Sequence, residues 1–256
     1  MYDNLTMNNN KIAIVTGGNR GIGFGITQSF IEAGYTVLVG ARQDRNLEDT
    51  FGDKVVFVPT DVRQEQAHHN LVQLAIEKYG RLDAYVNNAG YSFWKPIAEI
   101  DDVFLGDLLE TNLKGAFWGC KAAAKVMKSN AAIINVSSLA GKRGSSNNSA
   151  YVASKFGMNG LTQSLAKELG PRNIRVNAVC PVLIATEGLN KALDMKYAPG
   201  TGDPAGFIAN FTKSNAALLR MPTALEVGQM CVFLASKNAS AITGQCINVD
   251  CGVLPQ

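Results

Sequence analysis

Short apolar runs alternate with helix-like segments along almost the whole chain, and this alternation constrains the fold more than any other feature. Each run is nearly continuous in apolar residues, which is typical of strands buried on both faces of a parallel sheet. Strands that alternate with helices predict a sheet with helices on both faces. We expect strands at 11–16, 35–41, 55–59, 83–87, 131–136, 174–180 and 245–249.

The segments between these runs predict the helices and the domain organisation. Residues 64–79 carry apolar residues at helical spacing, among them Leu71, Leu74 and Ala75. No linker, repeat or low-complexity stretch divides the chain, so we predict one doubly wound α/β (Rossmann-type) domain over residues 11–256, after a flexible polar tail at 1–10. Further helices are expected at about 21–33, 108–128, 149–169 and 224–235, and an irregular stretch with short helical pieces at 186–219.

Composition and charge exclude several classes of protein. The net charge of +3 and the lack of a basic block argue against nucleic-acid binding. No apolar run reaches the ~18 residues that a membrane span needs, and the N-terminus lacks the apolar core of a secretory signal. The spacing of the five cysteines is irregular, which predicts reduced thiols in a cytoplasmic protein and no metal site. His68 and His69 lie in a polar run and are expected to face solvent.

A tyrosine and a lysine stand one helical turn apart in the helix expected to begin near Ser149. Tyr151 and Lys155 are four residues apart, so they share one face of that helix. A fixed ammonium group favours the phenolate and lowers the pKa of a phenol from its usual value of ~10. The pair can transfer a proton, but a Tyr and a Lys at this spacing also occur together on solvated helix faces.

A glycine-rich turn follows the first predicted strand and leads into a helix. It reads Gly17-Gly18-Asn19-Arg20-Gly21-Ile22-Gly23. Glycines let the backbone approach a pyrophosphate closely, and a helix N-terminus offers free amides and the positive end of the helix dipole. In doubly wound folds, ligands bind at the carboxyl ends of the strands. The turn is therefore expected to bind a nucleotide there.

Taken together, these motifs resemble those of the classical short-chain dehydrogenase/reductase family, from about Lys11 to Gly252. They occur in the order and at the spacing of that family, so a chance pairing of Tyr151 with Lys155 becomes a poor explanation. The motifs are Thr16 to Gly23, Asp61-Val62, Asn87-Asn88-Ala89-Gly90, Asn112, Ser138, Tyr151-x-x-x-Lys155, Pro181 and Thr186.

The resemblance implies hydride transfer between a nicotinamide cofactor and a carbonyl or secondary alcohol. Tyr151 would be the general acid in reduction and the base in oxidation, while Lys155 would lower its pKa and bind the nicotinamide ribose. Ser138 would polarise the substrate carbonyl together with Tyr151, and Asn112 would hold a water molecule that links Lys155 to solvent. The two hydroxyls would meet the charge that develops on the substrate oxygen, and no metal is required.

The resemblance also implies the cofactor contacts, and the charges near strand two indicate NADP(H) over NAD(H). An acidic residue past that strand would bind the ribose 2'-hydroxyl and repel a 2'-phosphate, but Ala41 and Arg42 stand there. By resemblance Arg20 comes close to the same place, and guanidinium groups suit a phosphate dianion; Asp44 weakens the argument slightly. The implied contacts are Gly17, Asn19, Arg20, Gly21, Ile22, Gly23, Arg42, Asp61, Val62, Asn88, Ala89, Gly90, Tyr151, Lys155, Pro181 and Thr186.

The substrate is expected to contact residues that follow strands four and six. Tyr91 and Trp94 suggest an apolar or ring-bearing substrate, unless this aromatic run packs against the long helix. Val182 replaces the glycine that usually follows Pro181 in the family, so it is expected to reshape this wall of the pocket. Cys251 replaces another family glycine, near the C-terminus, where it is expected to alter subunit contacts.

Three functions remain open from the sequence. The first is an NADP(H)-dependent oxidoreductase that acts on a small-molecule ketone or secondary alcohol. A 3-oxoacyl (β-ketoacyl) reductase shares all the motifs, and a nucleotide-binding regulator without turnover has the same fold; the intact set of Asn112, Ser138, Tyr151 and Lys155 favours an enzyme. The resemblance further implies a homotetramer, or a homodimer, packed through the helices at 108–128 and 150–169.

Overall fold

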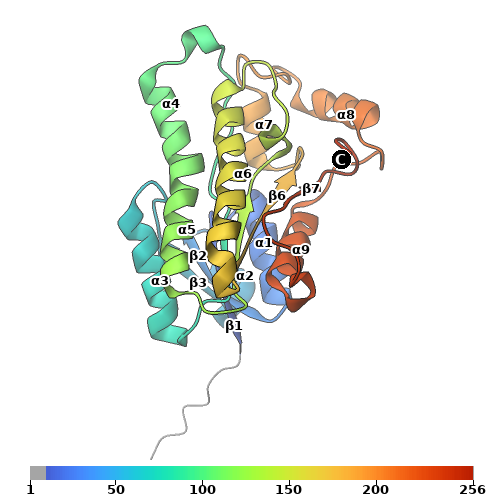
Figure 1. Cartoon of the computed structure of the whole chain (residues 1–256). Helices are drawn as coiled ribbons and strands as arrows, with labels where there is room; N and C mark the ends of the chain where they lie inside the picture. The colour runs from blue at the N-terminus through green and yellow to red at the C-terminus, as the bar shows by residue number, and fades with distance from the viewer. Residues whose placement is uncertain (1–9, 256) are drawn as a thin grey trace, which may run out of the picture.

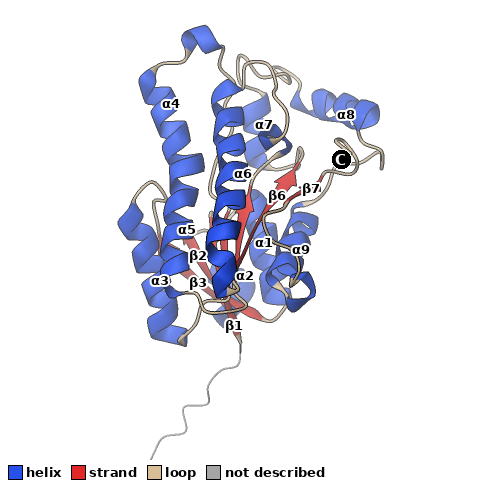
Figure 2. Ribbon diagram, in the orientation of Figure 1, coloured by secondary structure: helices blue, strands red, loops and turns tan. Residues whose placement is uncertain are grey.

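The computed structural model describes residues 10–255, which form a seven-stranded parallel sheet in the order β3-β2-β1-β4-β5-β6-β7. Figure 2 shows the strands of the sheet enclosed between helices, so the predicted doubly wound fold is confirmed. The predicted N-terminal tail lies outside the described residues, apart from Asn10. The strands are β1 (Lys11–Thr16), β2 (Tyr35–Ala41), β3 (Val55–Pro59), β4 (Ala84–Asn87), β5 (Ala132–Val136), β6 (Arg175–Pro181) and β7 (Cys246–Val249).

Helices cover both faces of the sheet (Figure 1). One face packs against α1 (Gly21–Glu32), α2 (Leu47–Phe51) and α9 (Ala224–Ala235). The other packs against α3 (Glu65–Tyr79), α5 (Gly115–Val126) and α6 (Ser149–Leu169), and α4 (Asp102–Leu109) leads into α5. The two remaining helices, α7 (Glu187–Leu193) and α8 (Pro204–Asn215), follow β6 and lie beyond its tip.

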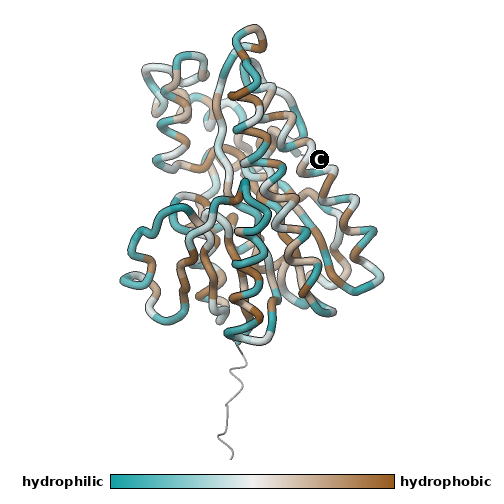
Figure 3. The backbone as a smooth tube through the Cα atoms, turned by 90° about the vertical axis from the view of Figure 1, so that its left-hand side faces the viewer, coloured by the Kyte–Doolittle hydropathy of each residue, from teal (hydrophilic) through white to brown (hydrophobic). Residues whose placement is uncertain are grey.

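The continuous apolar runs of the sequence reflect a core on each side of the sheet. Along β1, Ala13 and Val15 face the layer of α1 and α9, whereas Ile12 and Ile14 face the layer of α3 and α5. Successive side chains of a strand point to opposite faces, so a strand covered on both sides must be apolar throughout. In Figure 3 the central strands are largely brown, the colour of hydrophobic residues.

The helix expected at 108–128 begins earlier than the sequence indicated. Asp101 caps α4 by accepting a hydrogen bond from the Phe104 amide at 2.8 Å, and an aspartate at this position satisfies an otherwise unpaired helix amide. Between α4 and α5 the helix widens into a π-helical turn, η3 (Glu110–Lys114). The helical chain therefore continues through Asn112 to Val126. The short helix α2 was not predicted.

The stretch expected to be irregular, residues 186–219, contains two capped helices. Thr186 accepts a hydrogen bond from the Leu189 amide at 3.1 Å and begins α7. Asp203 accepts one from the Gly206 amide at 2.8 Å and begins α8. Both helices are short, as the sequence suggested. Among residues 10–255, no helix combines the length and the apolar character that a membrane crossing requires.

The prediction that His68 faces solvent is wrong, because the side chain is fully buried. Its Nδ1 lies 2.7 Å from the Tyr85 hydroxyl and its Nε2 lies 2.9 Å from the Val62 carbonyl oxygen. These two partners offset the cost of burying a polar ring, and burial lowers the pKa of His68. His68 shares a helix face with Leu71, Val72 and Ala75, so the helical period of the apolar residues places it inside.

Cys251 has a left-handed backbone with a φ of 53°. This conformation favours glycine, because a Cβ atom crowds the following carbonyl there. The geometry explains why glycine is the usual residue of the family at this position. Here the backbone is retained with a side chain on it, and the Cys251 carbonyl accepts a hydrogen bond from the Leu218 amide at 3.1 Å.

Candidate active site

The predicted motifs gather at the carboxyl edge of the sheet. Thr16 ends β1, Asn87 ends β4, Val136 ends β5 and Pro181 ends β6. These four strands are adjacent in the sheet and all parallel, so the segments that follow them lie at one edge. This is the edge at which doubly wound folds bind their ligands.

The glycine turn after β1 has the backbone of an anion-binding loop. Gly17 and Gly21 have φ values of 64° and 53°, where other residues are strained. A Cβ atom on Gly23 would lie 2.0 Å from the Gly17 carbonyl oxygen. Arg20 precedes α1 without a side-chain cap, which leaves the first amides of the helix for a ligand. The turn therefore fits the pyrophosphate of a dinucleotide.

Two other residues of the predicted turn make contacts of their own. Asn19 donates a hydrogen bond from Nδ2 to the Gln43 carbonyl oxygen at 2.7 Å, which ties the turn to the segment after β2. Ile22 packs against the hydrophobic core beneath α1. Both contacts fix the position of the turn, and neither uses the backbone amides at the start of α1.

The segment after β4 is held against the glycine turn by Thr16. The Thr16 hydroxyl accepts hydrogen bonds from the amides of Asn88 at 3.0 Å and Ala89 at 3.1 Å. Asn88 returns a bond from Nδ2 to the Thr16 carbonyl oxygen at 2.9 Å. A Cβ atom on Gly17 would lie 3.1 Å from the Ala89 Cα. Thr16 was not predicted as a site residue; its signal in the sequence is a polar residue at the end of an apolar strand.

Asn112 lies in the π-helical turn and is fully buried. Its Oδ1 accepts a hydrogen bond from the Tyr91 amide at 3.0 Å, and its Nδ2 donates to the Tyr91 carbonyl oxygen at 2.8 Å. A Cβ atom on Gly90 would lie 2.9 Å from the same Oδ1. The side chain thus braces the segment after β4 and approaches α6 through Ser154, 3.4 Å from Nδ2. Single π turns occur frequently at functional sites.

Ser138, Tyr151 and Lys155 come together beside the end of β5. Ser138 is near enough to Tyr151 to act on its hydroxyl and lower its pKa, and the Ser138 hydroxyl accepts a hydrogen bond from the Ala140 amide at 3.1 Å. The Lys155 side chain is buried and donates from Nζ to the Val136 carbonyl oxygen at 2.8 Å. That ammonium group lies 5.7 Å from the centre of the Tyr151 ring. The structure therefore brings together three of the four predicted catalytic side chains directly, with Asn112 one contact away.

Burial dominates the electrostatics of this group. It raises the pKa of Tyr151, although the hydrogen bond from Ser138 acts in the opposite direction. Burial also lowers the pKa of Lys155 to about 8. The effect of Lys155 on the pKa of Tyr151 stays a prediction. In this arrangement the ammonium group bonds to the Val136 carbonyl oxygen, and burial makes the largest contribution to the pKa of the phenol.

Asp61, predicted at the adenosine end, is held by an arginine that the sequence did not point to. Arg63 binds the Asp61 carboxylate in a bidentate manner, with Nη2–Oδ2 at 2.6 Å and Nε–Oδ1 at 3.0 Å. This bond, with a smaller contribution from Arg42, holds the pKa of Asp61 below its usual range. Arg45 and Arg20 both lower the pKa of Glu187 at the start of α7 slightly, after the larger effect of Lys191. Sequence reasoning missed Arg63, whose signal was an opposite charge two residues after Asp61.

The backbone carbonyl group of Val62 is held by two neighbouring helices. Its carbonyl oxygen is bonded to His68, and a Cβ atom on Gly115 would lie 3.0 Å from that oxygen. His68 was missed because polar neighbours concealed its place on the buried helix face. The pair Asp61-Val62 is therefore fixed by contacts to α3 and α5, which makes it a rigid support for a ring.

The segment after β6 returns to the glycine turn. A Cβ atom on Gly21 would lie 3.5 Å from the Thr186 side chain, so Thr186 adjoins the turn. Val182, which follows Pro181, donates from its amide to the Val249 carbonyl oxygen at 3.4 Å. Its side chain packs against the same apolar cluster as Phe211 of α8. Val182 therefore connects the end of β6 to the segment that covers it.

The aromatic residues that follow β4 pack against other helices to a greater extent than the sequence suggested. Trp94 is 7% exposed and lies in a cluster with Ala192 and Leu193 of α7. The Phe93 ring meets Phe104 of α4 edge-on, with centroids 5.4 Å apart. Tyr91 is 41% exposed and is the member of this run that remains accessible. Trp94 is thus a contact beneath α7, whereas Tyr91 stays a substrate candidate.

Polar contacts tie the α7–α8 segment to the loops below it. The Tyr197 hydroxyl donates to Glu99 Oε1 at 2.5 Å. Asn147 donates from Nδ2 to the Tyr197 carbonyl oxygen at 3.4 Å, and its own carbonyl oxygen accepts from the Lys95 amide at 2.6 Å. These bonds join the segments after β4, β5 and β6 over the reaction centre.

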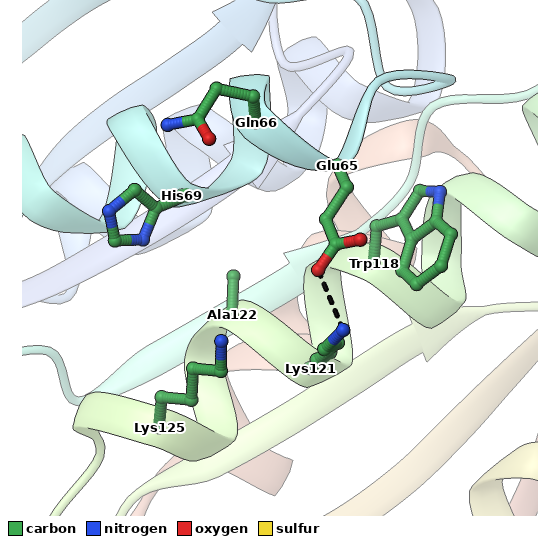
Figure 4. A pocket seen from close by; sticks show the side chains of 7 residues that line it. All are labelled: Glu65, Gln66, His69, Trp118, Lys121, Ala122 and Lys125. Atoms are coloured by element: carbon green, nitrogen blue, oxygen red, sulfur yellow. Dashed lines mark ion pairs between the residues drawn. The ribbon is translucent and has the colours of Figure 1, made fainter.

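A surface depression of about 410 Å³ lies elsewhere, between α3 and α5 (Figure 4). An ion pair of 2.7 Å between Glu65 and Lys121 spans it. Its walls come from two helices rather than from strand ends, so it is separate from the site above. The lining residues are Glu65, Gln66, His69, Trp118, Lys121, Ala122 and Lys125.

Comparison with known proteins agrees with this geometry. Residues 17–254 match the family model described as enoyl-(acyl carrier protein) reductase. The 3-oxoacyl-[acyl-carrier-protein] reductase FabG of Chlamydia muridarum is 36% identical over 95% of this chain and 97% of its own. The L-2,3-butanediol dehydrogenase of Corynebacterium glutamicum is 34% identical over 95% and 98%, respectively.

A solved structure shows the same fold over nearly the whole chain. The ligand-free aldohexose dehydrogenase of Thermoplasma acidophilum has a TM-score of 0.87 and 29% identity, and the match covers 96% of this chain and 98% of that one. The family match extends across the glycine turn, the Ser138–Tyr151–Lys155 group and the last strand. The chain therefore belongs to the classical short-chain dehydrogenase/reductase family and is an oxidoreductase of that family.

Proposed function

We propose that this protein transfers a hydride between NADP(H) and a carbonyl or secondary alcohol substrate, with Tyr151 as the acid/base. The observation that carries the proposal is the grouping of Ser138, Tyr151 and the buried Lys155 at the carboxyl edge of the sheet, with the Lys155 ammonium 5.7 Å from the centre of the Tyr151 ring. Two hydroxyl groups that converge on one point are suited to a developing oxyanion. The glycine turn and Thr186 adjoin that edge and support a nicotinamide cofactor.

When bound, the nicotinamide supplies or accepts the hydride. Ser138 and Tyr151 hold the substrate oxygen, and in reduction the Tyr151 hydroxyl gives up its proton to that oxygen. The raised pKa of Tyr151 keeps the phenol protonated at neutral pH, as an acid requires. Lys155 stabilises the phenolate that forms, because its charge lies 5.7 Å from the ring centre. Asn112 keeps the segment after β4 in position.

The substrate is an apolar or ring-bearing ketone that enters beside Tyr91 and Val182. Tyr91 is accessible, and Val182 adds apolar surface next to Phe211. A 3-oxoacyl thioester is the second candidate, because the similar proteins include a 3-oxoacyl-[acyl-carrier-protein] reductase. A regulator without turnover is disfavoured because the hydroxyl pair and the buried lysine are all present.

NADP(H) is the proposed cofactor because of the charge near the end of β2. Arg42 follows that strand and is close enough to Asp61 to influence its carboxylate. Asp61 itself is neutralised by Arg63, so its charge repels a 2'-phosphate less. Arg42 and Arg20 are the candidates for the phosphate contact, and Arg42, which directly follows the strand, is the first to test.

We also propose that the chain acts as one domain over residues 11–256, in a cytoplasmic setting, and as a homotetramer or homodimer. All seven described strands share one sheet, which supports a single unit. The five cysteines are free thiols, which supports a reducing compartment. The faces of α4, α5 and α6 expose large apolar side chains, and surfaces of this kind mark interfaces. They are Val103, Leu105, Phe117 and Phe156.

Replacing the proposed acid should abolish turnover. We expect Tyr151→Phe to lower kcat by on the order of 10³, because the proton donor is lost while the ring remains. The measurement is NADPH oxidation with a panel of ketones that includes a 3-oxoacyl thioester. Tyr91→Phe is the matched control and should retain the rate on a non-aromatic ketone. Full activity of Tyr151→Phe would overturn the mechanism, and NADPH binding without turnover by the wild-type protein would favour the regulator.

Removing the proposed phosphate contact should change cofactor choice. We expect Arg42→Ala to raise the Kd of NADPH by roughly 10- to 100-fold, since a hydrogen bond to a charged group contributes about 1.5–3 kcal/mol. The Kd of NADH should stay the same, and fluorescence titration can measure both. Arg45→Ala, a nearby arginine, serves as the control. An equal loss for both cofactors in Arg42→Ala would contradict the assignment.

The rate of ketone reduction should fall as the pH rises through about 8. Below the pKa of Lys155, which is about 8, the ammonium is present and stabilises the phenolate; above it the charge is lost. The raised pKa of Tyr151 leaves the phenol protonated over the same range. The pH profile of kcat/KM between 6 and about 10 tests this. In Lys155→Arg, any remaining activity should lack the fall, whereas a flat wild-type profile would argue against a role for Lys155.

Placing a charge on the exposed apolar face should weaken assembly. Phe156→Asp adds a carboxylate to α6 at a side chain that is 47% exposed, and an unpaired charge is costly to bury in an interface. We expect a smaller species by analytical ultracentrifugation and an unchanged circular dichroism spectrum. Phe233→Asp, which adds the same charge on α9 and outside this face, is the control. An unaltered sedimentation coefficient in Phe156→Asp would exclude assembly through α6.

A further inference from the structure

A buried histidine and a buried tyrosine form a polar pair beneath the segment that follows β3. His68 and Tyr85 are both fully buried. The Nδ1 atom of His68 lies 2.7 Å from the Tyr85 hydroxyl oxygen, and its Nε2 atom lies 2.9 Å from the Val62 carbonyl oxygen. His68 belongs to α3 and Tyr85 to β4. The pair therefore joins Val62 to two elements of the framework, and it has no part in the reaction steps proposed above.

One arrangement of protons satisfies all three groups. A carbonyl oxygen can only accept a hydrogen bond, so Nε2 of His68 carries a proton and donates it to Val62. Burial lowers the pKa of His68, which favours the neutral ring, and a neutral ring with a proton on Nε2 has a bare Nδ1. Nδ1 therefore accepts, and the Tyr85 hydroxyl donates. The partners on its two sides thus determine the tautomer of His68.

The peptide group between Val62 and Arg63 is held at both ends. Its carbonyl oxygen bonds to His68, and its N–H, which belongs to Arg63, donates to Asp61 Oδ1 at 3.1 Å. In a planar trans peptide group the carbonyl and the N–H point in opposite directions. The bond that directs the carbonyl to His68 therefore directs the N–H to the Asp61 carboxylate. One rigid group thus connects the buried ring to that carboxylate.

Helix α5 restricts the space beside the same carbonyl group. A Cβ atom on Gly115 would lie 3.0 Å from the Val62 carbonyl oxygen and 3.2 Å from the Val62 Cβ atom. This contact limits where the Val62 carbonyl can lie, and the N–H of His68 sets the direction in which it points, because a hydrogen bond is directional.

Asp61 lies at the edge of the sheet where the cofactor is proposed to bind. The Thr60 amide donates to the Ala41 carbonyl oxygen, the last of β2, at 2.9 Å. In turn, the Gly17 amide of the glycine turn donates to the Gly40 carbonyl oxygen at 2.7 Å. The segments that follow β1, β2 and β3 are therefore neighbours. The Asp61 side chain is 23% exposed, so a ligand at this edge can reach it.

We propose that His68 is a positioning residue for the adenosine half of the cofactor. It fixes the orientation of the Asp61 carboxylate through the peptide group of Val62 and Arg63. Tyr85 holds the His68 ring in the tautomer that this bond requires. The assignment rests on the proposed function, because Asp61 is a cofactor contact only there. His68 and Tyr85 touch no cofactor atom themselves, and they act as the support that keeps a binding group in place.

The tautomer can be tested on the protein without any ligand. The chain contains two histidines, His68 and His69, so nitrogen-15 NMR resolves both rings, and His69→Gln assigns the signals. We expect the neutral ring with the proton on Nε2 at His68 near neutral pH. A ring of His68 with its proton on Nδ1, or with a proton on both nitrogens, would overturn the proposal.

Binding of the two halves of the cofactor separates a positioning role from a structural one. Adenosine 2',5'-bisphosphate carries the adenosine half, and reduced nicotinamide mononucleotide carries the other half; calorimetry measures both Kd values. We expect His68→Leu to raise the Kd of the bisphosphate by roughly tenfold, because the carboxylate loses its fixed orientation. The Kd of the mononucleotide should stay the same. An equal loss for both halves would indicate a purely structural role and would overturn the proposal.

Milder variants keep the test decisive if His68→Leu does not fold. Tyr85→Phe removes only the hydroxyl and should raise the Kd of the bisphosphate severalfold. His68→Gln can place an amide N–H near the position of Nε2, so it should bind the bisphosphate with close to wild-type affinity. His69→Leu is the matched control, because His69 is exposed and faces the depression between α3 and α5 (Figure 4), and its binding should be unchanged.

The same titrations distinguish failure of this assignment from failure of the proposed function. A wild-type protein that binds neither NADPH nor the bisphosphate would overturn both. Wild-type binding that is unaltered in His68→Leu and Tyr85→Phe would overturn the role of His68 alone. Neither NMR nor calorimetry depends on turnover, so an inactive wild-type protein that binds NADPH would refute the proposed catalysis without affecting the role of His68.

Discussion

A chain of buried hydrogen bonds between β4, β5 and α6 is the interaction on which the site depends. Asn87 Nδ2 donates to Asn135 Oδ1 at 2.9 Å, and Asn135 Nδ2 donates to Thr162 Oγ1 at 2.9 Å. Asn87 and Asn135 are also opposed in the strand register. Buried amides are costly unless they are paired, so this chain selects one register. The helix that carries Tyr151 is thereby fixed relative to both strands.

Two glycines in the same region allow elements next to the site to pack closely together. A Cβ atom on Gly119 would lie 2.1 Å from Asn87 Oδ1, so α5 can approach β4 only without a side chain there. Gly157 likewise allows α6 to approach Leu113 closely, because the Leu113 side chain would lie 2.9 Å from a Cβ atom added at this glycine. Close packing of these helices positions the π-helical turn, and with it Asn112, against the segment after β4.

Burial shifts the pKa values of the two titratable groups of the reaction centre in opposite directions. Desolvation keeps the Tyr151 phenol neutral and brings the pKa of Lys155 down to about 8. The lysine is thus close to losing its proton at physiological pH, and its contact with the Val136 carbonyl helps to hold the charge.

The sequence by itself determined the doubly wound fold, the family and the edge at which the site forms. Apolar runs specify buried parallel strands, and the polar residues that end them, such as Ser138, must then meet at one edge. It could not place His68, because the polar neighbours of that residue hid a buried helix face. Nor could it assign Trp94, which packs beneath α7, far along the chain.

Only the tertiary structure decided the contacts between segments distant in sequence. These include the ion pair of Arg63 with Asp61, the burial of Trp94 beneath α7, and the direction of the pKa shift of Tyr151. The physical reason is that local patterns specify which face of an element is buried. Desolvation and the partners of a buried group depend on what packs against that face, and this is set by strand order and register.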